Sequence, residues 1–422
     1  MKGTQKIKAG ALQFVLFVGA IIAVLLFMFV LVAYSHTLFL KKTDLLVDMI
    51  QGADRGLQAS FKKRIPSGGT VLLPLDTDKN ITTQVEKTHW GLLELRKVMT
   101  TKGKLYFEKL ALVGHSGSER PALYLQDNLR PLILAGNTQI LGTVYLPERG
   151  VRTGNISGYS YNAPKLIYGQ ENIAKKTLPV LNEESNRQLE KLTAPFFEPE
   201  GEDIPLTREI VLKNSFKEPL KLIKGSHIHL EKVQLSGHIM VWASQKIVVN
   251  ASSQLEDVVL IAPVIEIGDR VNGSFQAIAS ESLDVGKACG LDYPTVLSVG
   301  HQHQDVPDQN DFVPKLSVDS RCDIRGIIIF EGPEMEFGRF RPGISIKEST
   351  SVTGTIFCSE SLELKGKVYG SVATGAFIAF ENGSIYQNHL YNGTINSKGL
   401  PLEFAGIGYE HEVNNQIMKW LF

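Results

Sequence analysis

Residues 279–285 read Ala-Ser-Glu-Ser-Leu-Asp-Val, and residues 358–364 read Cys-Ser-Glu-Ser-Leu-Glu-Leu. Each segment begins with a small residue and has apolar residues at its fifth and seventh positions, an alternation typical of a strand that buries one face. Looser copies of the pattern begin at residues 243, 262, 331 and 373, and a glycine precedes most of the copies. The distances between copies approach one turn of a repeat rather than one hairpin. The pattern therefore predicts short strands that recur with a structural repeat.

The repeat favours a parallel β-solenoid over residues 211–400. One turn of such a fold cannot bury its own apolar face, so stacked turns provide the core, and glycine or another small residue fits the corners. Leu283 and Leu362 then occupy equivalent inward positions. An antiparallel β-sandwich or meander is the alternative, because Asn-Gly pairs typical of hairpins begin at Asn272, Asn382 and Asn392.

The flanks of the repeat suggest further elements. Residues 66–175 carry short β-type runs between glycines and predict an N-terminal β region. Residues 176–210 read as a helical insertion followed by an acidic loop, with Asn182 as the cap of a helix over 183–192. Because open solenoid ends need caps, we expect residues 401–422 to form a C-terminal capping helix.

The start of the chain predicts a membrane anchor. The segment 9–40 contains no charged residue, and the apolar run from Phe14 to Tyr34 covers about 30 Å at helical rise, the thickness of a bilayer core. We expect residues 11–34 to span a membrane once and to contact the lipid bilayer. A cleaved secretory signal and a buried core helix are the alternatives, but the first usually has a shorter apolar run and the second a polar face.

The flanking charges predict the orientation of this anchor. Residues 1–10 form a leader with three lysines and no acid, whereas the lysines at 41 and 42 are soon followed by acids. The positive-inside rule places the leader in the cytoplasm and the C-terminal part in the periplasm or outside the cell. Residues 35–65 continue as a stalk helix, whose apolar stripe packs either on the following domain or on a partner helix.

Composition excludes several classes of function. Lysine plus arginine and aspartate plus glutamate both number 44, so the chain lacks the basic excess of a nucleic-acid-binding protein. Cys289, Cys322 and Cys358 have no CxxC spacing, and we expect them to be small buried residues. A nucleophile elbow, a phosphate-binding loop and a dinucleotide fingerprint are all missing from the sequence. We expect no catalytic residues, no cofactor and no enzymatic activity.

One cluster resembles metal ligands. His301 and His303 would share one face of a strand, and Asp305 follows them. The surrounding glutamine, proline and asparagine residues are typical of a solvated loop, so we expect no metal there.

Acidic residues also recur in the repeat, either as a catalytic face or as solvated side chains. A β-helical enzyme that acts on sugars needs carboxylates gathered on one outer face. The acids Glu281, Asp284, Glu360 and Glu363 recur with the repeat, and we expect them to be solvated.

The N-terminus, Lys2 to Val30, resembles the leader and membrane helix of type IV pilin-like proteins. In Lys6-Ile-Lys-Ala-Gly10, a short basic leader ends in glycine and a hydrophobic helix follows. This resemblance implies cleavage between Gly10 and Ala11. Val15 replaces the usual glutamate five residues after that bond, as in the minor pilins and pseudopilins that lack the acid, or else the leader remains uncleaved.

The repeat region is similar to bactofilin-type polymer-forming β-helical proteins, through its pattern rather than a motif. Together the features predict a membrane-anchored structural component of the bacterial envelope, in a pilus-like or secretion assembly whose partners bind through the anchor and stalk. The alternative function is a membrane-anchored β-helical glycan hydrolase or lyase, or a surface carbohydrate-binding protein.

Overall fold

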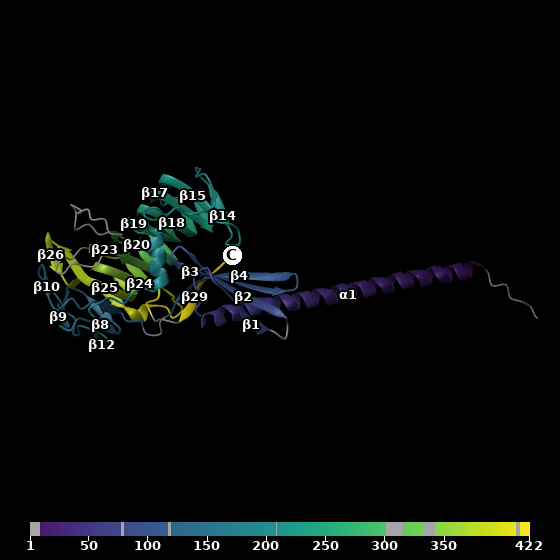
Figure 1. Cartoon of the computed structure of the whole chain (residues 1–422), viewed down its shortest axis with the longest axis horizontal. Coiled ribbons are helices and arrows are strands. Elements are labelled where there is room, and N and C mark those ends of the chain that lie inside the picture. The colour runs from purple at the N-terminus through teal and green to yellow at the C-terminus, as the bar shows by residue number, and fades with distance from the viewer. Residues whose placement is uncertain are drawn as a thin grey trace, which may run out of the picture. The chain divides into compact units, whose positions relative to one another are not determined.

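The protein is mainly β, with one long N-terminal apolar helix, as the sequence predicts (Figure 1). The computed structural model describes residues 9–76, 80–116, 120–207, 209–300, 315–332, 342–410 and 414–422. Its contacts divide the chain into two units. The helix unit comprises the residues up to 59 with 71–85 and 98–108, and the parallel unit comprises 60–70, 86–97 and 109–422.

A single continuous helix, α1 (Ala9–Ser60), contains the expected anchor and most of the expected stalk. Within the helix unit, the last part of α1 packs on strands. Met49 and Leu57 are each 1% exposed, and the Thr100 hydroxyl donates a hydrogen bond of 3.2 Å to the Met49 carbonyl. A Cβ atom on Gly56 would lie 2.4 Å from the Thr83 Cγ2 atom, so glycine allows this close approach. The apolar stripe of the stalk therefore packs on the β part of its own chain.

Five strands form a sheet in the order β1-β2-β3-β4-β29. Their bounds are β1 (Thr70–Asp76), β2 (Ile81–Trp90), β3 (Leu93–Lys102), β4 (Leu105–His115) and β29 (Asn415–Leu421). Two-residue turns join β2 to β3 and β3 to β4, which makes these neighbours antiparallel hairpins. Gly91 and Gly103 provide the positive φ angles, 58° and 61°, that such turns require. β29 pairs antiparallel with β4, so every strand from β5 to β28 is inserted between two neighbours of one sheet.

The expected C-terminal capping helix is wrong, because residues 415–421 form the strand β29. A seven-residue helix gains little stability by itself, whereas the edge of β4 offers unpaired backbone groups. Met418 and Leu421 are buried, and the Lys109 ammonium lies 3.7 Å from the ring centroid of Trp420. Pairing with a distant strand therefore prevails over the local helical pattern.

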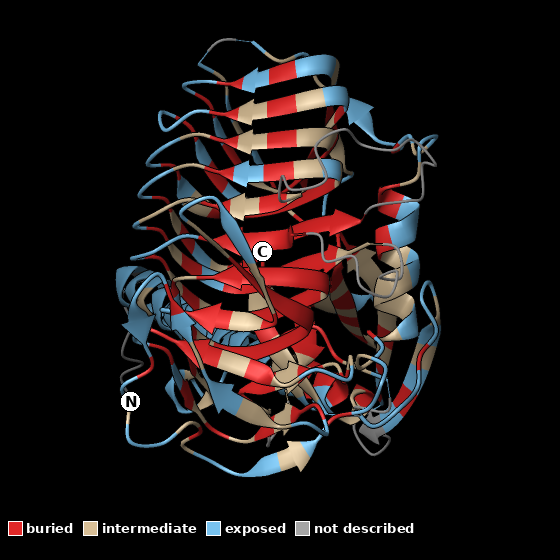
Figure 2. Ribbon diagram, turned by 90° about the vertical axis from the view of Figure 1, so that its left-hand side faces the viewer, coloured by how far each residue is buried: buried red, intermediate tan, exposed pale blue. Residues whose placement is uncertain are grey.

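The inserted strands form a closed parallel sheet system, stacked as successive rungs in Figure 2. Its first members are β14 (Val211–Asn214), β15 (Lys221–Leu230), β16 (Gln234–Gly237), β17 (Ile239–Val249), β18 (Gln254–Ile267), β19 (Asn272–Val285), β20 (Gly290–Gly300), β21 (Leu316–Val318), β22 (Asp323–Glu331), β23 (Pro342–Ile346), β24 (Ser351–Leu364) and β25 (Lys367–Glu381).

Strands from earlier in the chain continue the stack beyond β25. β5 (Leu123–Leu125) pairs in parallel with β25, β8 (Val144–Leu146) with β5, and β12 (Glu171–Ile173) with β8. β28 (Thr394–Asn396) joins β25 to β7 (Gln139–Leu141), and β6 (Leu132–Ala135) lies between β27 (His389–Tyr391) and β9 (Val151–Thr153). The remaining short elements of the described chain are β10 (Asn155–Ile156), β11 (Tyr159–Ser160), β13 (Glu202–Asp203), β26 (Ser384–Gln387) and the 3-10 turn Ser397–Gly399.

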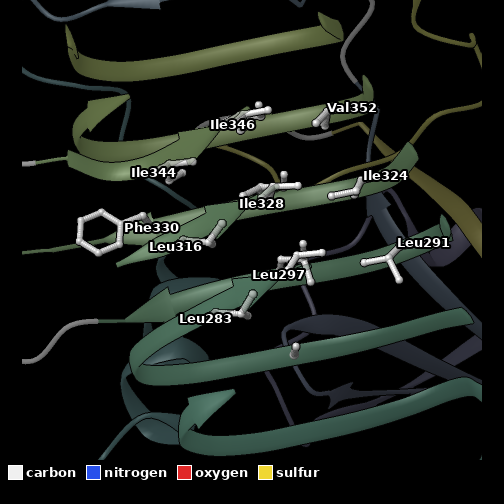
Figure 3. Close-up of a cluster of buried hydrophobic side chains, with 14 of the residues drawn as sticks. Leu283, Leu291, Leu297, Leu316, Ile324, Ile328, Phe330, Ile344, Ile346 and Val352 are labelled. Carbon is white, nitrogen blue, oxygen red and sulfur yellow. The ribbon is translucent and has the colours of Figure 1, made fainter. Parts of the chain in front are cut away.

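Columns of aliphatic side chains from successive rungs line the interior of the stack. Leu283 pairs with Leu316, Leu316 with Ile344, and Ile344 with Leu362, and all four are 0% exposed. Figure 3 shows the first three of these side chains on successive strands. The prediction that Leu283 and Leu362 occupy equivalent inward positions is confirmed. Each rung thus covers the apolar side chains of its neighbours, and the core runs along the stack.

The register corrects two of the repeat copies. Cys358 pairs with Phe330 on one side and with Thr374 on the other. The copies assigned to residues 331 and 373 are therefore shifted by one residue. Irregularities in the strand pairing, such as the one between Cys358 and Ser361, move the register locally and blur the repeat in the sequence.

Three of the glycines that precede repeat copies occupy one stacked column, whereas Gly237 pairs with Asn214. Gly326 pairs with Gly354, and Gly354 with Gly370, at φ angles of 154°, 153° and 155°. A Cβ atom on Gly354 would lie 1.8 Å from the Gly326 carbonyl oxygen. Only glycine fits, because both the backbone conformation and the spacing between rungs exclude a side chain.

The helix α2 (Glu183–Leu192) has the bounds that the sequence predicts. The Asn182 side chain accepts a hydrogen bond of 2.9 Å from the Glu184 backbone N–H and so caps the first turn. Leu189 and Leu192 are buried in a cluster that includes Ile261, so α2 covers the outer face of the parallel strands.

Candidate functional site

The largest exposed apolar surface among the described residues is the first part of α1. Its most apolar 18-residue window has a mean hydropathy of 3.3 and is 0% buried. Phe14, Leu26 and Phe29 are 61–72% exposed in this segment. A helix satisfies its backbone hydrogen bonds internally, so this surface suits a hydrocarbon environment. The helix is long and apolar enough to cross a membrane.

The two residues of the expected cleavage site lie at the start of α1. Gly10 and Ala11 are helical and exposed, and nothing lies within 4 Å of a Cβ atom built on Gly10. Val15, which stands where the pilin-like pattern has glutamate, is 65% exposed. The residues before Ala9 lie outside the described part of the chain.

The candidate metal ligands His301, His303 and Asp305 also lie outside the described residues. Within the described ranges, no group of three or more His, Cys, Asp or Glu side chains could hold a metal ion.

The acids of the repeat do not share one environment. Glu281 and Asp284 are exposed, as expected. Glu360 and Glu363 are 6% and 3% exposed, so the expectation that these two are solvated is wrong. Both belong to β24, in which almost every residue is buried, whereas exposed and buried residues alternate at the end of β19. The sequence pattern is the same, but the outer face of the β24 rung is covered.

Glu363 is held as a carboxylate by three neighbours. The Ser345 hydroxyl donates a hydrogen bond of 2.5 Å to Oε2, and the Lys347 Nζ atom lies 3.0 Å from the same oxygen. The Lys365 Nζ atom lies 3.5 Å from Oε1 and 2.7 Å from the Glu381 carboxylate. Burial alone would raise the pKa of Glu363, but the Ser345 hydrogen bond and the lysine charges outweigh it and lower the pKa. A general acid needs the opposite shift, so this cluster suits a structural role.

Glu331, at the end of β22, has the properties of an acid that holds a proton. Burial and the nearby charge of Glu190 raise its pKa to about 7. Sequence analysis missed this residue, because neither its burial nor the nearby charge of Glu190 in α2 is signalled by the local sequence.

A groove of about 300 Å³ lies between the end of α2 and the outer face of the parallel strands. Its walls are residues 192–198, 242–244, 261–263 and Ser280. Phe196 is 97% exposed and Trp242 is partly exposed, so aromatic surface faces the groove from two elements. The Thr193 hydroxyl donates to the Leu189 carbonyl at 2.7 Å and is already satisfied. The groove has the apolar walls of a binding site.

No protein-family model matches this chain, and none of the curated proteins matches it. Among solved structures, it is similar to the crystal structure of the competence-associated pilin ComZ from Thermus thermophilus. The two chains are 8% identical, the likeness covers 89% of this chain and 96% of that chain, and the TM-score is 0.21. A likeness this distant carries no functional argument.

Proposed function

We propose that this protein is a membrane-anchored structural component of the bacterial envelope, built as a pilin-like subunit with an inserted parallel β domain. The observation that carries the proposal is the continuity of α1. Its first part is an exposed apolar segment, and its last part packs on strands of the same unit, with Met49 and Leu57 each 1% exposed. One rigid helix thus joins a membrane-embedding surface to a folded domain.

The inserted domain fits an extended structural role. We interpret its stack as a parallel β-solenoid, because the equivalent positions of successive rungs pair in register over the column that contains Leu283 and Leu362. Such a fold presents long outer faces for contacts with other components. We propose that the partners are envelope proteins bound through the anchor, the stalk or these faces, and that the protein performs no catalysis.

The proposed topology places the leader in the cytoplasm and the strands in the periplasm or outside the cell. The three lysines of the leader support this orientation through the positive-inside rule. Protease added to spheroplasts should then digest the β domain, whereas a fully protected β domain would refute the orientation.

A paired set of variants tests the anchor itself. Ile22→Lys with Leu26→Lys introduces two charges into the middle of the apolar segment, each costing about 2.5–3.5 kcal/mol of insertion free energy. The control, Val211→Lys with Leu402→Lys, adds the same charges at positions that are 61% and 91% exposed. We expect the first variant to leave the membrane fraction or to be degraded, and the control to stay with the membrane after carbonate extraction. Equal behaviour of the two variants would contradict the anchor.

The groove beside Trp242 favours one second candidate function, a surface carbohydrate-binding protein. Aromatic faces such as those of Phe196 and Trp242 can stack on sugar rings, and both residues line the groove of about 300 Å³. Binding of envelope glycans to the full-length protein in detergent, abolished by Trp242→Ala, would favour this candidate. Co-purification of envelope proteins without glycan binding would favour the structural role.

A further inference from the structure

Two of the three cysteines lie side by side on neighbouring rungs. Cys289 immediately precedes β20 and Cys322 immediately precedes β22, and the first residues of these strands, Gly290 and Asp323, are paired in parallel. The Asp323 backbone N–H donates a hydrogen bond of 2.9 Å to the Cys289 carbonyl. Neighbouring strands are about 4.8 Å apart, and disulfides join residues whose Cα atoms are about 4.4–6.8 Å apart. The backbone spacing therefore suits a disulfide.

The two thiols also point in the same direction. The Cys289 Sγ atom lies 3.1 Å from the Gly268 carbonyl oxygen, and the Cys322 Sγ atom lies 3.1 Å from the Gly286 carbonyl oxygen. The two glycines are equivalent, because each follows a strand end, Ile267 or Val285, and these ends pair in register. Each thiol thus donates to the same corner of an earlier rung. Both cysteines are only 2% exposed.

The two thiols also affect each other's ionisation. A hydrogen bond with the Cys289 side chain lowers the pKa of Cys322 to about 7, and the same contact raises the pKa of Cys289. The thiolate is the nucleophile in thiol–disulfide exchange. Either thiol of the pair can attack once it is ionised, and the other then resolves the mixed disulfide.

We propose that Cys289 and Cys322 form a disulfide that links two neighbouring rungs of the parallel unit. The oxidant is a small-molecule disulfide such as oxidised glutathione. The thiolate of one of the two cysteines attacks one sulfur of this reagent, the S–S bond of the reagent breaks, and one glutathione thiolate leaves and takes up a proton. The other cysteine then loses its proton to solvent and attacks the protein sulfur of the mixed disulfide, which releases the second glutathione as a thiolate that takes up a proton. The protein loses two hydrogens, and one oxidised glutathione becomes two reduced molecules.

Cys358 provides an internal control. It is 0% exposed, burial raises its pKa, and its partners on the neighbouring strands are Phe330 and Thr374. It therefore has no cysteine at the equivalent position of either adjoining rung and is expected to stay reduced. Access of the oxidant to the pair requires local opening of a rung, so we expect oxidation to proceed more slowly than that of an exposed thiol.

The test uses the purified full-length protein in detergent, equilibrated with oxidised glutathione. Free thiols are then alkylated under denaturing conditions, and intact mass and peptide mapping follow. The expected result is one alkylated cysteine, Cys358, and one peptide pair joined through Cys289 and Cys322. Cys358→Ser should keep the link, whereas Cys289→Ser and Cys322→Ser should each lose it, with the remaining thiol of the pair either alkylated or joined to one glutathione.

Peptide mapping of the unmodified protein decides the question even where a variant fails to fold. Three alkylated cysteines after prolonged oxidation, a link that includes Cys358, or a link between two chains on a non-reducing gel would each overturn the proposal. When the disulfide is present, the urea midpoint of unfolding should fall on reduction of the unmodified protein but remain unchanged in Cys322→Ser.

Discussion

Replacing Glu363 by glutamine removes the charge from a carboxylate that is 3% exposed and lies between two lysines. Breaking a fully buried ion pair costs about 3–5 kcal/mol of the free energy of unfolding, whereas an exposed pair contributes about 0–1 kcal/mol. The side chains of Lys365 and Lys347 are 19% and 46% exposed, so solvent screens the second far more than the first. We therefore expect Glu363→Gln to lower the free energy of unfolding by about 2 kcal/mol.

Asp284 supplies a matched control in the same outward column. It pairs with Ser317, Ser317 pairs with Ser345, and Ser345 pairs with Glu363, but Asp284 is exposed. Asp284→Asn should change the free energy of unfolding by no more than about 0.5 kcal/mol. Urea unfolding followed by circular dichroism measures both variants. Equal losses would show that the covered environment of β24 does not set the contribution of its acid.

The same variant predicts a dependence on pH. The pKa of Glu363 is lowered in the folded protein from an ordinary value of 4.5, so its stabilising contribution is complete above that value. The contribution is lost as the pH falls through the lower folded pKa. The difference between the wild type and Glu363→Gln should therefore be full at neutral pH and shrink below about pH 4. A difference that grows on acidification would refute the assigned direction of the shift.

Two further comparisons test the stack. Leu283→Asp buries an unpaired charge at a position that is 0% exposed and should cost several kcal/mol of unfolding free energy. Glu281→Lys changes an exposed site and should cost little. Similar thermal midpoints for the two variants would contradict the register. Gly354→Ala places a Cβ atom 1.8 Å from a backbone oxygen and should prevent stacking. Gly150→Ala, also at positive φ but with open space around it, should cost only about 1 kcal/mol of unfolding free energy. Soluble yield and thermal midpoint measure both variants, and a tolerated Gly354→Ala would refute the steric argument.

The elements that depend on local pattern could be predicted from the sequence. The alternation around Leu283 and Leu362 identifies their inward positions, and the cap at Asn182 identifies α2. Pairing over long distances could not be predicted in this way. Residues 415–421 have a helical arrangement of apolar side chains, yet they become a strand because the edge of β4 is available. The burial of Glu360 likewise depends on the residues that cover the outer face of its rung, and the repeat pattern does not indicate which rungs are covered.

The candidate sites also differ in whether local sequence or long-range packing creates them. The apolar segment of α1 is continuous in the sequence, so its length and composition suffice to identify it. The groove beside Trp242 has walls from four separate stretches of chain, and only the stacking of strands brings them together. The raised pKa of Glu331 also needs α2, which contributes Glu190 from more than a hundred residues away.

The position of β29 has a consequence for synthesis of the chain. His115 of β4 and its partner Asn415 are separated by about 300 residues, which a ribosome adds in about 15–60 s at about 5–20 residues per second. Throughout that interval, β4 has been made but its neighbour has not. The nascent protein therefore exposes an open strand edge that can pair with other chains. Chains that terminate before residue 415 would keep this edge permanently, so aggregation of truncated products is expected to exceed that of chains carrying internal substitutions.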